Sequence, residues 1–321
     1  SEAPPEPVMN VDAEVKKALD ESRAALKGMN LPKATMDALD KEKDPGVFLD
    51  LLVKALGIDP EAGAKLQHEN FLNNRKLLED RGYDPNLAGR LQVEQITSRE
   101  DVIRLYAEGR DFNGVDMSNL DLQGLDLHEA QFSHTLLFNT KLNNCNLIGA
   151  NLNGANLDNA DLSDVNLEGA DLTKATLRNA KLVQANLQSA LLQEAKLDEA
   201  DLSQANLGLA QLQKTRLDSC VLKQANLTGA DLSEARLIKA DLTGAKLSEC
   251  NASKSDFSEA MLDDAKLEDA DLTDALFNQC SLRRANLTAA VLTGAQCKQA
   301  NFEAAILTQV QAGEALFDQA I

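Results

Sequence analysis

The residues best suited to chemistry in this chain are five cysteines and three histidines. A thiolate can act as a nucleophile or hold a metal ion, and an imidazole can transfer protons. No second His, Cys or carboxylate joins any histidine at a spacing typical of metal ligands; the three are His68, His128 and His134. The sequence also lacks nucleophile-elbow, P-loop and Gly-rich dinucleotide motifs. We therefore predict that the protein is not an enzyme and has no catalytic residue, metal site or cofactor.

A five-residue repeat must position these side chains, and it runs without a break from Asp111 to Ala320. Typical units are Asn151-Leu-Asn-Gly-Ala155 and Asn156-Leu-Asp-Asn-Ala160. The second position of a unit is nearly always Leu or Phe, the fifth is mostly Ala, and the other three are mostly polar. A period of five fits neither an amphipathic helix nor an alternating strand. Two inward positions in five instead require a coil that turns a corner in every unit.

Four such sides close a coil of twenty residues, and stacked coils can pair their backbones at about 4.8 Å. The repeat therefore predicts a mainly β solenoid of about ten coils, roughly 50 Å long, in which each coil contacts only its neighbours. Aromatic residues make up 3% of the chain and Trp is absent, which fits a narrow lumen filled by Leu, Phe and Ala. Six of the nine phenylalanines occupy the second position of a unit: Phe112, Phe132, Phe257, Phe277, Phe302 and Phe317.

The cysteines follow the repeat, because four occupy the fifth position and one the second; they are Cys145, Cys220, Cys250, Cys280 and Cys297. No two are twenty residues apart. Cys220 and Cys280 share a side but lie three coils apart, about 14 Å, which is too far for a disulfide. We predict buried free thiols that act as small apolar side chains. Such thiols suit a reducing compartment.

The A(D/N)LxX pattern of residues 111–321 resembles the pentapeptide-repeat family. The resemblance covers about two thirds of the chain and implies a right-handed quadrilateral β-helix. It also implies an alternative function, because some members mimic DNA and inhibit or protect type II topoisomerases. The repeat region here has a net charge of about −14, which is half the charge of duplex DNA over the same length and is mixed with lysines.

We divide the chain into a flexible linker over residues 1–10, a small α-helical region over 11–97, a capping helix over 98–110 and the β-helix over 111–321. The opening Ser1 and the Pro/Glu-rich residues after it suggest an excised piece of a longer protein or the product of tag cleavage. The capping helix is expected to close the first coil, whose apolar lumen and backbone groups would otherwise be exposed. Its residues form a capping box followed by apolar side chains: Thr97, Glu100, Val102, Ile103 and Tyr106.

Outward positions become apolar towards the C-terminal end of the repeat, at Leu276, Val291, Ile306, Leu316 and Ile321. We predict that these residues form an association surface. This surface has two candidate partners. One is a second copy of the chain, in a homodimer joined end to end, and the other is a different protein.

One row of residues twenty apart is an uncharged asparagine ladder, Asn146, Asn166, Asn186, Asn206 and Asn226. The neighbouring outward positions over these five coils, which include Leu209, contain one charge, Glu168. This face needs little desolvation and is the candidate docking surface, although stacked Asn amides can equally serve the fold alone.

The chain carries a formal charge of −19, so we expect no direct binding to nucleic acid or to a membrane surface. The segment from Ile96 to Gly109 and the first repeat units resemble the helix-to-repeat junction of proteins encoded in bacterial type VI secretion clusters. The resemblance implies an acidic, cytoplasmic adaptor, a non-catalytic scaffold whose partners would be secretion effectors or spike components.

Overall fold

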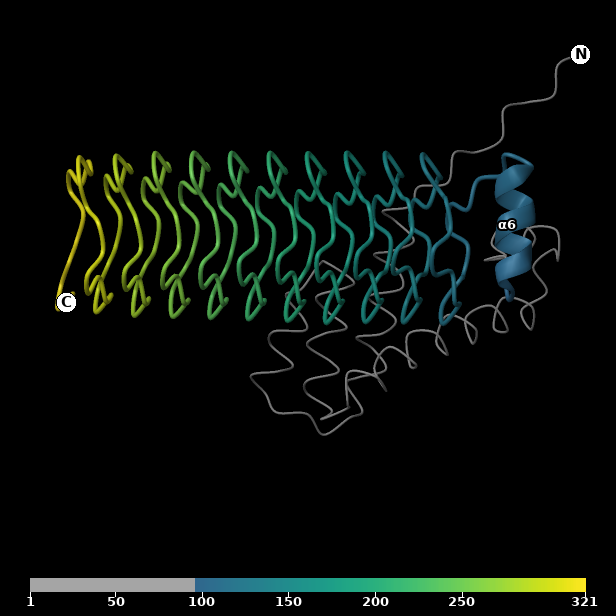
Figure 1. Ribbon diagram of the computed structural model, residues 1–321, viewed down its shortest axis with the longest axis horizontal. Coiled ribbons are helices and arrows are strands. Elements are labelled where there is room, and N and C mark those ends of the chain that lie inside the picture. Colours follow the sequence, from purple (N-terminus) through teal and green to yellow (C-terminus); the bar gives the residue numbers. More distant parts are fainter. Residues whose placement is uncertain (1–95) are drawn as a thin grey trace, which may run out of the picture. The chain divides into compact units, whose positions relative to one another are not determined.

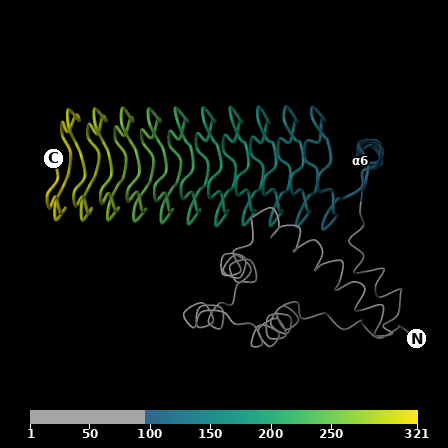
Figure 2. The same ribbon diagram turned by 90° about the horizontal axis from the view of Figure 1, so that it is seen from below.

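The computed structural model describes residues 96–321 (Figure 1). The predicted linker over 1–10 and nearly all of the predicted helical region over 11–97 lie outside the described residues. Coils of backbone stack along one axis from residue 111 onwards, and a helix lies at the end where the repeats begin (Figures 1 and 2).

The coils pair through isolated parallel β-bridges rather than long strands. The bridges begin at Asp116 with Leu136 and continue to Gln296 with Leu316, and every one joins residues twenty apart. One coil therefore takes four units, as the sequence predicts. The bridged residue is the first of each unit, so this position lies on a flat side of the coil.

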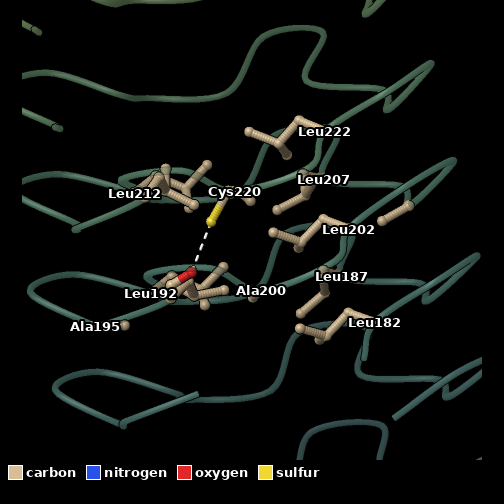
Figure 3. Packing of buried hydrophobic residues seen from close by; sticks show 14 of the residues in the cluster. Leu182, Leu187, Leu192, Ala195, Ala200, Leu202, Leu207, Leu212, Cys220 and Leu222 are labelled. Atoms are coloured by element: carbon tan, nitrogen blue, oxygen red, sulfur yellow. Dashed lines mark hydrogen bonds between the residues drawn. The ribbon is translucent and has the colours of Figure 1, made fainter. Parts of the chain in front are cut away.

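Each coil is fixed to the next by backbone hydrogen bonds that repeat with the same spacing. In the middle of the rod, Leu187 N donates to Asn206 O at 2.7 Å and Asn206 N donates to Ala185 O at 2.9 Å. The second and fifth positions point inward and are buried from Phe112 to Ala300, with few exceptions near the N-terminal end. Figure 3 shows this packing for Leu182, Leu187, Leu192, Leu202 and their neighbours. Two pairs of phenylalanine rings stack in register, with centroids 5.3 Å apart for Phe112 and Phe132 and 5.1 Å apart for Phe257 and Phe277.

A tight turn forms every corner, and the fourth position of each unit has a positive φ from Gly114 to Gln319. The turn is closed by a hydrogen bond from the fifth residue's N–H to the second residue's carbonyl, as from Ala190 to Leu187 at 3.1 Å. Left-handed backbone is costly for branched side chains and is tolerated best by Gly and Asn. No Val, Ile, Thr or Pro occupies this position in any unit.

The helix at the N-terminal end of the solenoid is α6, Arg99–Ala107. It buries Val102 and Leu105 in the apolar cluster of the solenoid. Polar contacts also fix it to the first coil: Arg99 Nη1 donates to Asp121 O at 3.3 Å and Tyr106 Oη donates to His128 O at 2.9 Å. The helix therefore covers the lumen at this end.

Two details of the predicted cap differ. The N-cap residue is Ser98 rather than Thr97, because its hydroxyl accepts the Asp101 N–H at 3.1 Å and donates to the Asp101 carboxylate at 2.8 Å. Glu100 is exposed in the first turn and makes no capping contact with Thr97, which is also exposed. Ile103 is 45% exposed. It lies outside the helix face that buries Val102 and Leu105. Tyr106 is half-buried, and its hydroxyl contacts the first coil.

These rules define the outer surface. We call a stack of residues twenty apart a row. The first and third positions flank the inward second position, while the fourth position and the next unit's first position flank the inward fifth. A flat side therefore carries three rows, from the fourth position of one unit and the first and third positions of the next.

The left-handed corner predicts the effect of substitutions at Asn179, an exposed fourth-position residue with φ +55°. Asn179→Val should cost about 1–2 kcal/mol of unfolding free energy, because a β-branched side chain clashes in this conformation. Asn179→Gly should cost clearly less. Urea unfolding followed by circular dichroism measures both, and equal losses would contradict the turn assignment.

Candidate interaction surfaces

The asparagine row lies on one flat side and is bonded internally. The Asn206 amide donates to Asn186 Oδ1 at 3.1 Å and the Asn226 amide donates to Asn206 Oδ1 at 2.9 Å. Each side-chain oxygen also accepts a backbone N–H two residues on, as from Gly208 to Asn206 at 3.2 Å. The row is half-buried, and its amides hold the coils in register as well as forming surface.

The flat side contains glutamines that the sequence analysis did not assign to it. Gln184, Gln204 and Gln224 form a parallel row at the preceding corner, joined by amide hydrogen bonds of 3.0 and 3.5 Å. The Asn206 amide also donates to Gln188 at 3.2 Å. We call this surface, over residues 144–228, the amide side. Its charged residues are Asp164 and Glu168. The sequence analysis counted only Glu168, because it did not assign the corner row that contains Asp164 to this side.

Leu209 lies at the turn that borders the amide side and is 60% exposed. Its backbone has φ +59°, a conformation that disfavours large apolar residues. Its side chain covers Gly229 in the next coil, where an added Cβ would come within 2.9 Å of Leu209 Cδ2. Ile148 is a second exposed apolar residue on the amide side, at 40%. Most of the Leu209 side chain nevertheless stays exposed, which makes it the most prominent apolar feature beside this surface.

The predicted C-terminal association residues do not form one patch. Ile306, Leu316 and Ile321 belong to the last coil and are exposed by 48%, 55% and 78%. Leu276 and Val291 lie in earlier coils, are half-buried and belong to different sides. The exposed apolar surface at this end is completed by two inward-position residues, Leu307 and Phe317, at 47% and 42%.

Family models match most of the described repeats. A model described as pentapeptide repeats matches eight copies over residues 106–139, 130–169, 140–179, 170–208 and 270–309, and one described as a pentapeptide repeat region matches 210–287. Together they cover more than half of the chain. The chain belongs to the pentapeptide-repeat family. Its solenoid is the right-handed β-helix of that family.

Solved structures of other pentapeptide-repeat proteins resemble this one. HetL from the cyanobacterium Nostoc sp. strain PCC 7120, involved in heterocyst differentiation regulation, is 33% identical, over 67% of this chain and 98% of HetL, with a TM-score of 0.44. QnrB1, a plasmid-mediated fluoroquinolone resistance protein, is 16% identical over 61% of this chain and 90% of its own, with a TM-score of 0.43. No curated protein matches the chain significantly.

All five thiols of the pentapeptide-repeat domain are buried and unpaired. Two of them donate to second-position carbonyls of the preceding coil, Cys145 to Leu122 O and Cys220 to Leu197 O. Figure 3 shows the bond of Cys220. Thr215 makes the same contact with Leu192 O at 2.8 Å. A small donor can therefore replace Ala at the fifth position without an unpaired polar group. Burial raises the pKa of Cys250 and of Cys297 to about 12, so these thiols are poor nucleophiles.

The polar cluster at the cap joins α6 to the first coils. His128 Nδ1 lies 2.9 Å from Asp126 Oδ1 and 3.3 Å from Tyr106 Oη. The hydrogen bond and charge of Asp126 raise the pKa of His128. The other described histidine, His134, lies at a corner, and its ring covers Gly154. Residues 96–321 contain no group of three or more potential metal ligands, and α6 is too short and polar to span a membrane.

The buried thiols predict chemical inertness. In the native protein none of the five should react with a thiol reagent such as Ellman's reagent at pH 8, because burial disfavours the thiolate and blocks access. All five should react after denaturation in guanidinium. Rapid labelling of even one thiol in the native protein would contradict the packing of the lumen.

The cap cluster predicts a titration. The imidazolium of His128 is favoured in the folded protein, so its interaction with Asp126 is complete below the unfolded pKa of about 6.5 and is lost as pH rises through the higher folded pKa. Asp126→Asn should lower the His128 pKa towards 6.5, as measured by NMR. A wild-type value unchanged by this substitution would exclude the contact.

Proposed function

We propose that this pentapeptide-repeat protein is a non-catalytic scaffold that binds another protein through the amide side and its bordering turn. The observation that carries the proposal is Leu209, a largely exposed leucine in a left-handed conformation beside a surface of internally bonded amides. Burying such a surface has a small desolvation free energy, because its polar groups keep their hydrogen-bond partners. A rigid row of coils also loses little entropy when a partner binds.

The junction between α6 and the repeats supplies a more specific proposal for the partner. It resembles that of proteins from type VI secretion clusters, and on that resemblance we propose that the chain recruits effectors or spike components in the cytoplasm. The competing function is a DNA-mimicking inhibitor or protector of a type II topoisomerase. Affinity capture from the native cell with mass spectrometry separates them: secretion components support the adaptor, whereas topoisomerase subunits together with inhibition or drug protection in a supercoiling assay would overturn it.

Leu209→Asn separates binding from folding. Asn is better suited than Leu to φ +59°, so stability should stay equal or rise. Loss of the exposed apolar side chain should weaken capture of the partner about tenfold or more. Unchanged affinity, measured by calorimetry with the identified partner, would exclude the turn from the interface.

Charge insertion tests the whole side. Asn186→Arg with Asn206→Arg should abolish capture, because it places two large cations in the contact. The matched control is Ile238→Arg with Ser258→Arg, which puts the same charges at the same spacing on the opposite side of the coils and should bind normally. Circular dichroism verifies the fold of both variants, and equal binding by the two would contradict this location of the site.

A further inference from the structure

A second flat side of the solenoid carries many charged side chains, whereas the amide side carries few. Its three rows run from residue 174 to residue 278 over six coils and contain seven basic and six acidic side chains. In a chain of net charge −19, this surface is close to neutral overall. We call it the charged side.

The central row of the charged side carries stacked cations held by carboxylates of the preceding coil. Arg216 Nη2 lies 3.2 Å from Asp198 Oδ1, and Arg236 Nε lies 2.8 Å from Asp218 Oδ2. Burial raises the pKa of Asp218 although Arg236 opposes the shift. These ion pairs are partly buried and fix the shape of the surface.

The corner row of the charged side alternates strictly in sign. From the N-terminal end it reads Lys174, Glu194, Lys214, Glu234, Lys254 and Asp274. All six side chains are exposed at left-handed corners. Lys214 Nζ and Glu234 Oε2 lie 3.8 Å apart, and both side chains remain more than half exposed.

An alternating row with an even number of members is complementary to itself when one copy is reversed. A twofold axis across the rods, between the coils of Lys214 and Glu234, would place Lys214 opposite Glu234 of a second copy. The same axis places Glu194 opposite Lys254 and Lys174 opposite Asp274, so all six contacts of the row join opposite charges. A slip of one coil, about 4.8 Å, would place like charges together.

The remaining rows tolerate this arrangement. The axis places Lys196 opposite Asp256, which adds a further opposite pair in the central row. Arg216 would lie opposite Arg236, but each guanidinium already has its own carboxylate. The third row brings together Asp198 with Ser258 and Asp218 with Ile238, so no like-charged pair arises there.

We propose that the charged side binds a second copy of this chain side by side, with the two rods antiparallel. The contact is isologous, as closed dimers require. Exposed ion pairs contribute little energy each, so their role is to set orientation and register, and the association is weak and salt-dependent. This dimer uses a lateral surface and leaves both ends of the solenoid, and the amide side, outside the contact.

Charge-swap variants of the full chain test the proposal, because they leave composition and net charge unchanged. Lys174→Glu with Glu194→Lys, the outer swap, makes four of the six contacts across the axis repulsive and creates one like-charged neighbour pair within the chain. Lys214→Glu with Glu234→Lys, the inner swap, keeps all six contacts attractive but creates two like-charged neighbour pairs within the chain.

Sedimentation equilibrium at low ionic strength should show a wild-type dimer that dissociates as salt is added. The outer swap should weaken association about tenfold or more, and the inner swap should leave it near the wild-type value. Adding Lys254→Glu and Asp274→Lys to the outer swap restores every opposite pair and should restore the dimer. Circular dichroism confirms the fold of each variant.

A wild-type protein that stays monomeric at about 100 µM under these conditions would overturn the proposal. So would a dimer that both swaps weaken equally, or that neither changes, since the row would then serve only stacking within one chain. Cross-linking gives the orientation: Thr176→Cys and Leu276→Cys lie in the central row, five coils apart within a chain but opposite each other between antiparallel copies. The one-coil-shifted control, Asn156→Cys with Leu276→Cys, should not cross-link, and equal cross-linking of both pairs would contradict the register.

Discussion

The structure depends on one constraint, the backbone hydrogen-bond ladder that joins residues twenty apart. Coils can stack only if every corner is made in the same way, and each corner needs a left-handed residue at the fourth position. The lumen follows from this geometry, because it has room for a large and a small apolar side chain in every unit. The scarcity of aromatic residues, the Ala-rich composition and the buried thiols are all consequences of the ladder.

The ladder also separates the core from the surface. Inward positions repeat every five residues and are nearly the same on all four sides, whereas outward rows repeat every twenty and differ from side to side. One side therefore holds stacked amides and another holds alternating charges over the same kind of core. The recognition that we propose uses rows of side chains at a fixed spacing.

Much of this could be predicted from the sequence, because a five-residue period with two apolar positions determines which side chains are inward. The buried positions of Cys220 and Phe257 followed directly. The corners were harder to predict, although the absence of β-branched residues at the fourth position was a usable signal. Without the corner geometry, the glutamine row beside Asn206 could not be assigned to the amide side. The cap was predicted one residue early because Thr97 and Ser98 fit the same capping pattern, and only the start of α6 at Arg99 decides between them.

The most direct test of this account is thermal unfolding, followed by circular dichroism, of two deletion variants in the middle of the rod. Removing the whole unit 191–195 turns the downstream sides by one corner but preserves the inward pattern and the ladder. The account predicts that this variant keeps the wild-type spectrum and a cooperative transition. Removing residues 191–193 instead breaks the five-residue period and should unfold the coils around the deletion. If the two variants lose structure to the same extent, the five-residue unit does not determine the fold and the account is wrong.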